Sequence, residues 1–140
     1  MGCHFVLCCV NTAQKGNLSE LKIAVRLTEL GKNVLRPFGE GSRYDLLLDE
    51  GGIFKRIQCK TGRLRNGSIV FNTASGFSWK TGRRDYKGQA ELFGVYCPDT
   101  GCCYLVPVDS VPGSSIAYLR VDPTVNNQSK RIRFAKDFEL

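Results

Sequence analysis

The sequence predicts an α+β fold in which one helix is followed by a series of β-strands. Three observations support this prediction. Apolar residues recur at helical spacing between residues 16 and 30, and Gly31 follows them. Two later β-prone segments are each interrupted by a dipeptide that favours a tight hairpin turn, Gly51-Gly52 and Asn66-Gly67. Hydrophobic residues make up 42% of the 140 residues, which suffices for one domain with a modest core.

The helix is expected from Gly16 to Leu30. Asn17 is suited to cap its start, and Glu20 stands three residues later at the spacing of a capping box. Gly31 suits the C-terminal cap. Glu20 has a second interpretation, in which it points over the sheet toward Asp45 and adds a carboxylate to a metal site. A strand follows at residues 33–36 and ends at a proline.

The segment from Tyr44 to Lys60 is predicted to be a hairpin that turns at Gly51-Gly52. A turn of two central residues places Asp45 opposite Gln58, and strand alternation puts Lys60 on the same face. That face then holds a carboxylate, an amide oxygen and an ammonium, which suit a hard-metal site with a charge that steadies an oxyanion. A four-residue loop would instead place Arg56 opposite Asp45 as an ordinary cross-strand salt bridge.

Further strands complete the prediction. The second strand of the hairpin is expected to continue through Leu64, to turn at Asn66-Gly67 and to return at residues 68–72, so that three antiparallel strands follow the helix. Apolar segments predict strands at residues 90–97, 102–108 and 115–121. The basic, amphipathic segment 130–136 predicts a terminal helix or strand. Residues 1–14 are an unassigned N-terminal extension, and residues 15–140 form one domain.

Positive charge is concentrated in the middle of the chain. The net charge is +7, and the segment from Lys55 to Lys87 contains nine basic residues with Asp85 as its only acid. Clustering of one sign indicates a polyanion partner, with nucleic acid as the leading candidate and a solubilising surface as the alternative. Residues 73–88 within it are polar and glycine-containing, and predict either a functional connection or a disordered loop. The residues expected to contact DNA are Ser42, Arg43, Arg63, Arg65, Trp79, Lys80, Arg83, Arg84, Tyr86 and Lys87.

The seven cysteines indicate a reducing compartment, because their number is odd and two pairs are adjacent in the sequence. Buried free cysteines are the favoured interpretation. The alternative is a structural zinc site built on Cys97 with Cys102 or Cys103. No apolar run reaches the roughly 20 residues of a membrane-spanning helix, so no membrane partner is expected.

The order of these features resembles the PD-(D/E)xK nuclease superfamily. The resemblance is carried by Glu20 on the helix, Tyr44-Asp45 at the first hairpin strand and Gln58-Cys59-Lys60 on the second. Two positions depart from the superfamily pattern, since Tyr44 replaces a proline and Gln58 replaces an acidic residue. More narrowly, the segments Lys15-Gly16-Asn17-Leu18-Ser19-Glu20, Arg43-Tyr44-Asp45-Leu46 and Arg56-Ile57-Gln58-Cys59-Lys60-Thr61 resemble the group I intron-associated branch, the cyanobacterial intron homing endonucleases. In that branch a glutamine at the position of Gln58 is expected.

The resemblance implies a restriction-endonuclease-like core, with a mixed β-sheet flanked by helices. It also implies a magnesium-dependent, sequence-specific endonuclease that hydrolyses both strands of DNA and is encoded in an intron, with Mn²⁺ as a substitute ion. Asp45, the Gln58 carbonyl, the Cys59 main-chain carbonyl and Glu20 would hold the metal, and Lys60 would orient or help deprotonate the attacking water, or stabilise transition-state charge. A homotetramer and a cytoplasmic, nucleoid-associated location are further implications.

Two alternatives to a homing endonuclease stay open. One is a nuclease selective for Holliday junctions, whose fold would look alike. The other is a catalytically inactive DNA-binding module on the same fold, which the amide at Gln58 favours because it removes one negative charge from the metal site.

Overall fold

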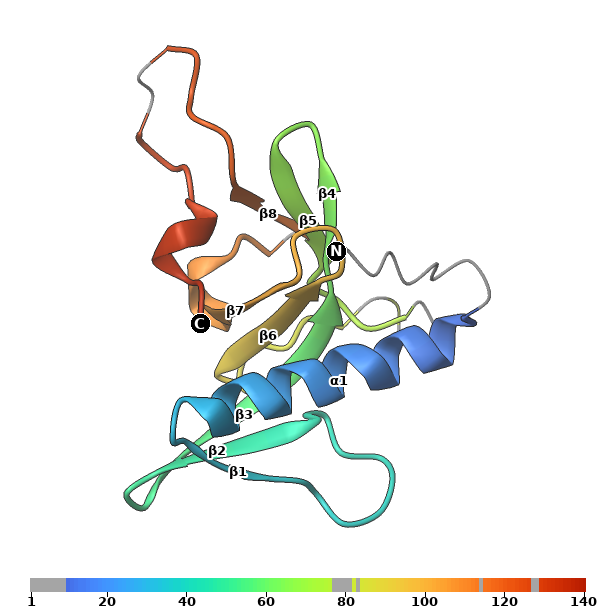
Figure 1. The fold of residues 1–140 in the computed structure, drawn as a ribbon. Helices are drawn as coiled ribbons and strands as arrows, with labels where there is room; N and C mark the ends of the chain where they lie inside the picture. The colour runs from blue at the N-terminus through green and yellow to red at the C-terminus, as the bar shows by residue number, and fades with distance from the viewer. Residues whose placement is uncertain (1–9, 77–81, 83, 114, 127–128) are drawn as a thin grey trace.

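The computed structural model describes residues 10–76, 82, 84–113, 115–126 and 129–140. The regular structure of this part of the chain is mostly β-strand, with one long helix near its start (Figure 1). In chain order the elements are α1 (Thr12–Glu29), β1 (Asn33–Leu35), β2 (Leu46–Glu50), β3 (Ile53–Thr61), β4 (Arg63–Arg65), β5 (Ser68–Asn72), β6 (Leu92–Cys97), β7 (Cys102–Pro107), η2 (Val108–Ser110), β8 (Ile116–Arg120) and η3 (Ala135–Asp137).

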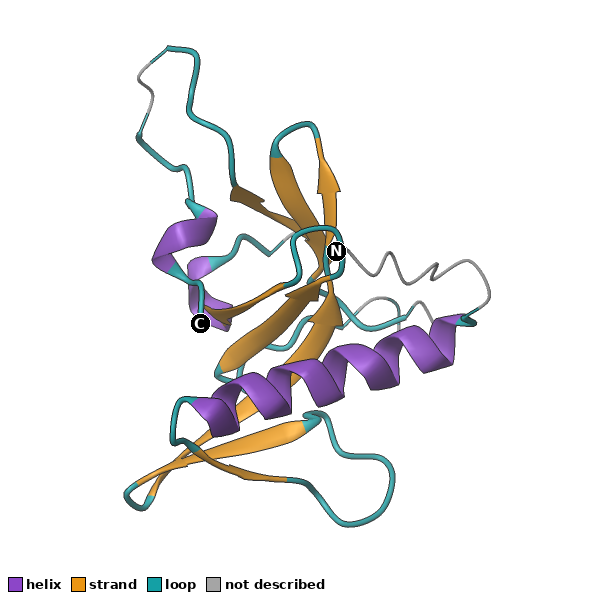
Figure 2. Ribbon diagram, in the orientation of Figure 1, coloured by secondary structure: helices purple, strands orange, loops and turns teal. Residues whose placement is uncertain are grey.

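The strands form two sheets, and with the helix they make three layers. The larger sheet has the order β1-β2-β3-β6-β7, and α1 crosses one of its faces (Figure 2). The smaller sheet, β4-β5-β8, packs against the other face, so a sheet lies where a second flanking helix was expected. Strand β3 pairs with β6 in parallel and with β2 in antiparallel orientation. The larger sheet is therefore mixed, which confirms the predicted class.

Helix α1 starts earlier than predicted. Its N-cap is Asn11, whose side chain accepts the N–H of Gln14 at 2.9 Å, while the Gln14 side chain accepts the N–H of Asn11 at 3.0 Å. This is a complete capping box, so the assignment of the cap to Asn17 and Glu20 was wrong. The C-terminal prediction is confirmed, because Gly31 has a φ of 74° and the N–H of Lys32 reaches the Leu27 carbonyl in a Schellman motif.

The first hairpin has the predicted two-residue turn. Leu46 pairs with Ile57 and Glu50 with Ile53, and both glycines between the strands have positive φ angles. The four-residue alternative is excluded, because Arg56 pairs with Leu47. The side chain of Arg56 forms an ion pair with Glu91 instead.

The predicted long strand from Ile53 to Leu64 is interrupted at Gly62. A Cβ at this position would lie 2.7 Å from the Ile69 Cγ2 and 3.0 Å from the Val95 Cγ1, so only glycine fits without a shift of its neighbours. At this point the chain leaves the larger sheet and joins the smaller one. The turn at Asn66-Gly67 is confirmed, but the expectation of three successive antiparallel strands was wrong, since β4 and β5 belong to the second sheet.

The later strands are confirmed as β6, β7 and β8, with ends that differ by one or two residues. The segment 130–136 forms neither the expected helix nor a strand. Its regular structure is a single β-bridge between Phe134 and Arg120 and the start of the one-turn 3-10 helix η3 at Ala135. No helix in the described part of the chain is long and apolar enough to span a membrane.

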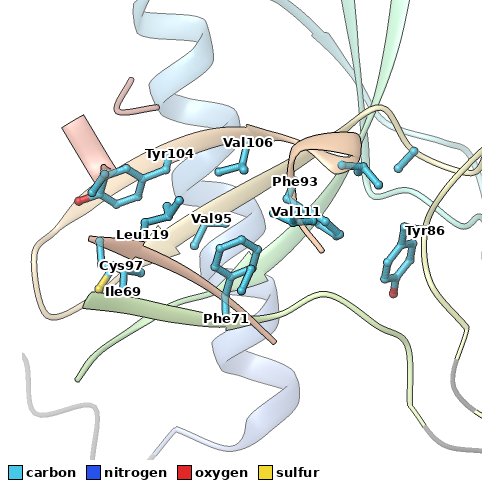
Figure 3. Close-up of a cluster of buried hydrophobic side chains, with 14 residues drawn as sticks. Ile69, Phe71, Tyr86, Phe93, Val95, Cys97, Tyr104, Val106, Val111 and Leu119 are labelled. Carbon is cyan, nitrogen blue, oxygen red and sulfur yellow. The ribbon is translucent and has the colours of Figure 1, made fainter. Parts of the chain in front are cut away.

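Two hydrophobic clusters hold the layers together. The first lies between α1 and the larger sheet and includes Ile23, Leu27 and Ile57. The second lies between the two sheets and is shown in Figure 3. Cys97 and Cys103 are buried and Cys59 and Cys102 half-buried, and all four are free thiols. For these four residues the structure therefore matches the interpretation of packed free cysteines.

Candidate active site

Asp45 lies immediately before Leu46, the first residue of β2. One of its carboxylate oxygens, Oδ2, accepts hydrogen bonds from the Gln58 Nε2 at 2.6 Å and from the Cys59 main-chain N–H at 2.7 Å. The Asp45 N–H in turn donates to the Ile57 carbonyl at 2.9 Å. Residues 57–59 of β3 thus fix the backbone and the carboxylate of Asp45, and the predicted contact with Gln58 is present.

The pKa of Asp45 is raised above its ordinary value, and loss of solvation on burial is the main cause. The Cys59 N–H, Lys60, Arg36 and Gln58 act in the opposite direction, in that order. Burial therefore outweighs four groups that favour the charged carboxylate. A bound cation would offset this desolvation, because it would stabilise the ionised form directly.

Lys60 lies on the same face of β3 as Gln58, two residues along. Its Nζ donates a hydrogen bond to the Tyr86 hydroxyl at 3.2 Å and lies 4.6 Å from the centre of the Tyr86 ring. Burial lowers the pKa of Lys60, and the positive charge of Arg43 lowers it further, against the opposing effect of Asp45. The ammonium is therefore held in place and is easier to deprotonate than an exposed lysine.

Tyr86, which contacts Lys60, is buried rather than exposed. Its side chain is 5% exposed, and its ring meets Phe93 edge-on with 5.7 Å between centroids, at one end of the cluster in Figure 3. The Arg43 guanidinium lies 4.7 Å from the same ring centre and donates to the Asp85 carbonyl and to the Gln89 side chain. Tyr86, which was expected to contact DNA, is therefore not an exposed aromatic.

Glu20 approaches the site from α1. It forms an ion pair with Arg36 at 3.0 Å and takes no part in the helix cap, which lies at Asn11. Burial is the main cause that raises the pKa of Glu20, and the charge of Asp45 raises it further, while Arg36 lowers it. The charge of Asp45 therefore acts on Glu20, and the second interpretation, in which Glu20 adds a carboxylate to a metal site, stays a prediction. Arg36 was not predicted, because nothing in its local sequence indicates a partner on α1.

The residues around Asp45 offer oxygen atoms that suit a hard divalent ion. The Asp45 carboxylate supplies the charge, and Gln58 supplies an amide oxygen. The carbonyl of a strand residue points to the same side as its N–H, so the Cys59 carbonyl faces the Asp45 side. Within the described residues no group of three or more His, Cys, Asp or Glu side chains occurs that could hold an ion. An ion at this site would therefore depend on amide and main-chain oxygens as well as carboxylates.

The predicted DNA contacts fall into three groups. Ser42, Arg84 and Lys87 are exposed in loops, and Arg63 and Arg65 are exposed on β4. Arg43 and Tyr86 belong to the cluster around Lys60. The three remaining residues, Trp79, Lys80 and Arg83, lie outside the described residues. A groove of about 500 Å³ connects Lys60 to Arg63 and Arg65, and Lys15 of α1 also lines it.

Comparison with known proteins shows the family and the fold of the chain. The profile of the PD-(D/E)XK endonuclease family matches residues 10–140. Among solved structures, the bacterial homing endonuclease I-Ssp6803I is similar with a TM-score of 0.70 and 23% identity, over 92% of this chain and 88% of that chain. This similarity shows a shared restriction-endonuclease-like fold. A Holliday junction resolvase, Hjc of the archaeal hyperthermophile Archaeoglobus fulgidus, matches with a TM-score of 0.47 and 16% identity, over 76% of this chain and 84% of that chain. No curated protein matches the sequence significantly.

Proposed function

Because the chain belongs to the PD-(D/E)XK endonuclease family, we propose that it is a magnesium-dependent enzyme that cuts both strands of DNA at a specific sequence. The class of DNA endonuclease follows from the family. The metal dependence and the sequence specificity are the proposal. The observation that carries it is the arrangement of Asp45, Gln58 and Lys60 at the end of one hairpin, with Glu20 beside them.

Asp45, Gln58 and the Cys59 carbonyl would hold the ion, and Glu20 would hold one of its waters or a second ion. A divalent ion would supply charge neutralisation at the phosphate and activation of water. Mn²⁺ would substitute for Mg²⁺, because it accepts the same oxygen ligands. Gln58 contributes no charge, so the ion should bind more weakly here than at a site with two carboxylate ligands.

Lys60 would act on the water or on the phosphate. An ammonium has three donors, and the bond to the Tyr86 hydroxyl uses one of them. The other two remain for the attacking water or a phosphate oxygen. Because burial lowers the pKa of Lys60, the neutral amine that can take a proton from water is more accessible than in an exposed lysine.

We further propose that the protein is a homing endonuclease that acts as a homotetramer. The support is the resemblance of the segments around Glu20, Asp45 and Lys60 to the intron-associated branch, together with the description of I-Ssp6803I as a bacterial homing endonuclease. Four subunits would let a chain of 140 residues span a long target. The enzyme would act in the cytoplasm on nucleoid DNA. Sedimentation of the protein at micromolar concentration tests the subunit number.

The decisive experiment is cleavage of a large, heterogeneous DNA with Mg²⁺, beside the same reaction with EDTA. We expect discrete fragments with Mg²⁺ alone. Asp45→Asn should lower the cleavage rate by about 100-fold or more, since the metal site would lose its central carboxylate. The matched control is Asp49→Asn on β2, the strand that Asp45 precedes, because Asp49 bonds only to the hairpin turn and to Asn33 among the described residues. Equal loss in both variants would contradict the assigned role of Asp45.

Two further outcomes separate the alternatives. Faster cleavage of a four-way junction than of a linear duplex would favour a junction-selective nuclease. Retained DNA binding without cleavage under Mg²⁺ or Mn²⁺ would favour an inactive binding module.

A further inference from the structure

The outer face of the smaller sheet is a strongly basic surface next to the candidate active site. Side chains alternate along strands, and Ile69 and Leu119 are fully buried on the inner face. Their neighbours on β5 and β8 therefore point outward. Across the sheet, Arg65 pairs with Ser68 and Ser68 with Arg120, which places these three side chains in one row.

A second row lies beside the first. Arg63 pairs with Val70, and Val70 with Tyr118, whose side chain is 56% exposed. The two rows together carry three arginines around an exposed aromatic ring. We refer to the surface formed by Arg63, Arg65, Val70, Tyr118 and Arg120, with Ser68 buried among them, as the outer sheet face.

Grooves on both sides extend this basic surface. On the β4 side, the groove of about 500 Å³ adds Lys15 and Lys60. On the β8 side, a groove of about 420 Å³ adds Arg131 and Arg133. None of the described residues that line the two grooves is acidic. Asp99 and Asp122 lie at the margins, where Asp99 accepts the N–H of Leu64 and Asp122 lies against Gly67.

The cations of this surface form no ion pair with any described residue, although Arg120 and Arg133 donate hydrogen bonds to main-chain carbonyls. Arg63, Arg65 and Arg131 make no ion pair with any described residue, whereas Lys55 and Arg56 of the larger sheet pair with Glu50 and Glu91. Like charges on one sheet face repel each other. Such a surface is stabilised when a polyanion neutralises it.

We propose that the outer sheet face binds the duplex DNA that flanks the cleavage site. This inference deepens the proposed function and relies on it for the identity of the partner. Lys60 lies in the same groove as Arg63 and Arg65, so a duplex whose scissile phosphate is at Asp45 and Lys60 continues directly onto the sheet. The arginines contact phosphates, and Tyr118 contacts the sugar and base edges between them. Arg120, Arg131, Arg133 and Tyr118 are thereby added to the DNA interface.

The test measures binding of the full chain to a long duplex of mixed sequence by fluorescence anisotropy, in EDTA and over a range of salt. The variant Arg65→Gln with Arg131→Gln removes one charge from each side of the face. The matched control, Lys32→Gln with Lys55→Gln, removes two charges at the β2–β3 hairpin, which lies far from the β4–β5 hairpin (Figure 1). Thermal unfolding of each variant establishes that it is folded.

Each phosphate contact contributes about 0.9 to the slope of log affinity against log salt, so the slope should fall by about 1.8 in the first variant. Between 50 and 200 mM salt this makes binding about tenfold less sensitive to salt. The control should keep the wild-type slope. Tyr118→Ala should weaken binding without a change of slope, because tyrosine carries no charge.

Several results would overturn the assignment. These are an unchanged slope in the first variant, an equal fall in the control, unchanged affinity in Tyr118→Ala, or tighter binding of a single strand than of the duplex. Failure of the nuclease proposal is distinguishable, because binding in EDTA does not depend on cleavage. A protein that shows the expected slopes but cuts no DNA retains the binding face and loses the metal-dependent reaction.

Discussion

The substitution Gln58→Glu tests the metal site most directly, because it returns a second carboxylate to a position where this chain has an amide. In the present structure the Gln58 Nε2 donates to the Asp45 Oδ2 at 2.6 Å. The substitution removes that donor and places two carboxylates side by side. Without a metal ion the pair must either repel or share a proton.

The free-energy cost of repulsion between the two carboxylates can be compared with the cost of protonating one of them at a given pH. Two unit charges about 4 Å apart repel by about 4 kcal/mol at an effective dielectric constant of about 20. Protonation of an ordinary glutamate costs about 3.7 kcal/mol at pH 7 and about 1 kcal/mol at pH 5. We therefore expect a loss of about 4 kcal/mol in the free energy of unfolding at pH 7 and of about 1 kcal/mol at pH 5.

The direction of the pH dependence of stability follows from the linkage between proton binding and folding. The carboxyl pair has a higher pKa in the folded state than in the unfolded state, so the folded state binds more protons between the two values. The destabilisation is absent below the unfolded pKa and grows as the pH rises through the folded pKa. The variant should consequently become more stable, relative to wild type, as the pH is lowered from 7 to 5.

Magnesium should reverse much of this loss. If the ion relieves only a third of the repulsion, its affinity for the variant rises about tenfold. The assay is thermal unfolding of wild type and variant with EDTA and with increasing Mg²⁺, at pH 7 and at pH 5. Gln58→Met, which removes the hydrogen bond without adding charge, should lose about 1.5–3 kcal/mol at both pH values and gain less from Mg²⁺ than wild type, because it removes one of the proposed ligands. An identical response of wild type and Gln58→Glu to Mg²⁺ would show that Gln58 is not at the ligand position.

Two further predictions concern the supports of the site. Gly94→Ala should lower the midpoint of thermal unfolding by about 3–10 °C, because its Cβ would lie 3.0 Å from side-chain carbons of Ile23 and Ile57 at the contact of α1 with the sheet. Gly16 lies in α1, and a Cβ added there meets nothing within 4 Å. Gly16→Ala should therefore stabilise the protein by about 0.5–1 kcal/mol, and destabilisation would contradict the steric explanation for Gly94. Tyr86→Phe keeps the ring and removes the hydroxyl that Lys60 binds, so single-turnover cleavage should slow by about two- to tenfold with little change in stability. A cleavage rate equal to wild type would remove Tyr86 from the positioning of Lys60.

The elements that the sequence predicts correctly are those fixed by local chemistry. Gly51-Gly52 determines a two-residue turn, and that turn alone determines which β3 residue faces Asp45. The helix start was missed because two segments have the same capping spacing, and the residues alone do not say which one is used. Asn11 and Gln14 form the cap, while Asn17 lies within the helix.

Contacts between distant segments could not be predicted in the same way. Arg36 reaches Glu20 from β1's C-terminal end, and Tyr86 reaches Lys60 from a loop. Neither position has a spacing or composition that distinguishes it from an ordinary surface residue. Tyr86 lies in a polar, basic segment and was expected to contact DNA, whereas in the structure its ring packs against Phe93. Burial of this kind is decided by tertiary structure.

The position of Gly62 explains how one short segment serves both the chemistry and the proposed DNA interface. Gln58 and Lys60 precede it on β3, and Arg63 and Arg65 follow it on β4. A side chain at this position would collide with Ile69 and Val95, so the crossing from one sheet to the other requires glycine. Because only Thr61 and Gly62 separate Lys60 from Arg63, the cations on β4 follow directly on the lysine that we propose to act in the reaction. If a duplex binds the outer sheet face as proposed, the covalent chain itself would align it with Asp45, without a hinge between binding and cleavage.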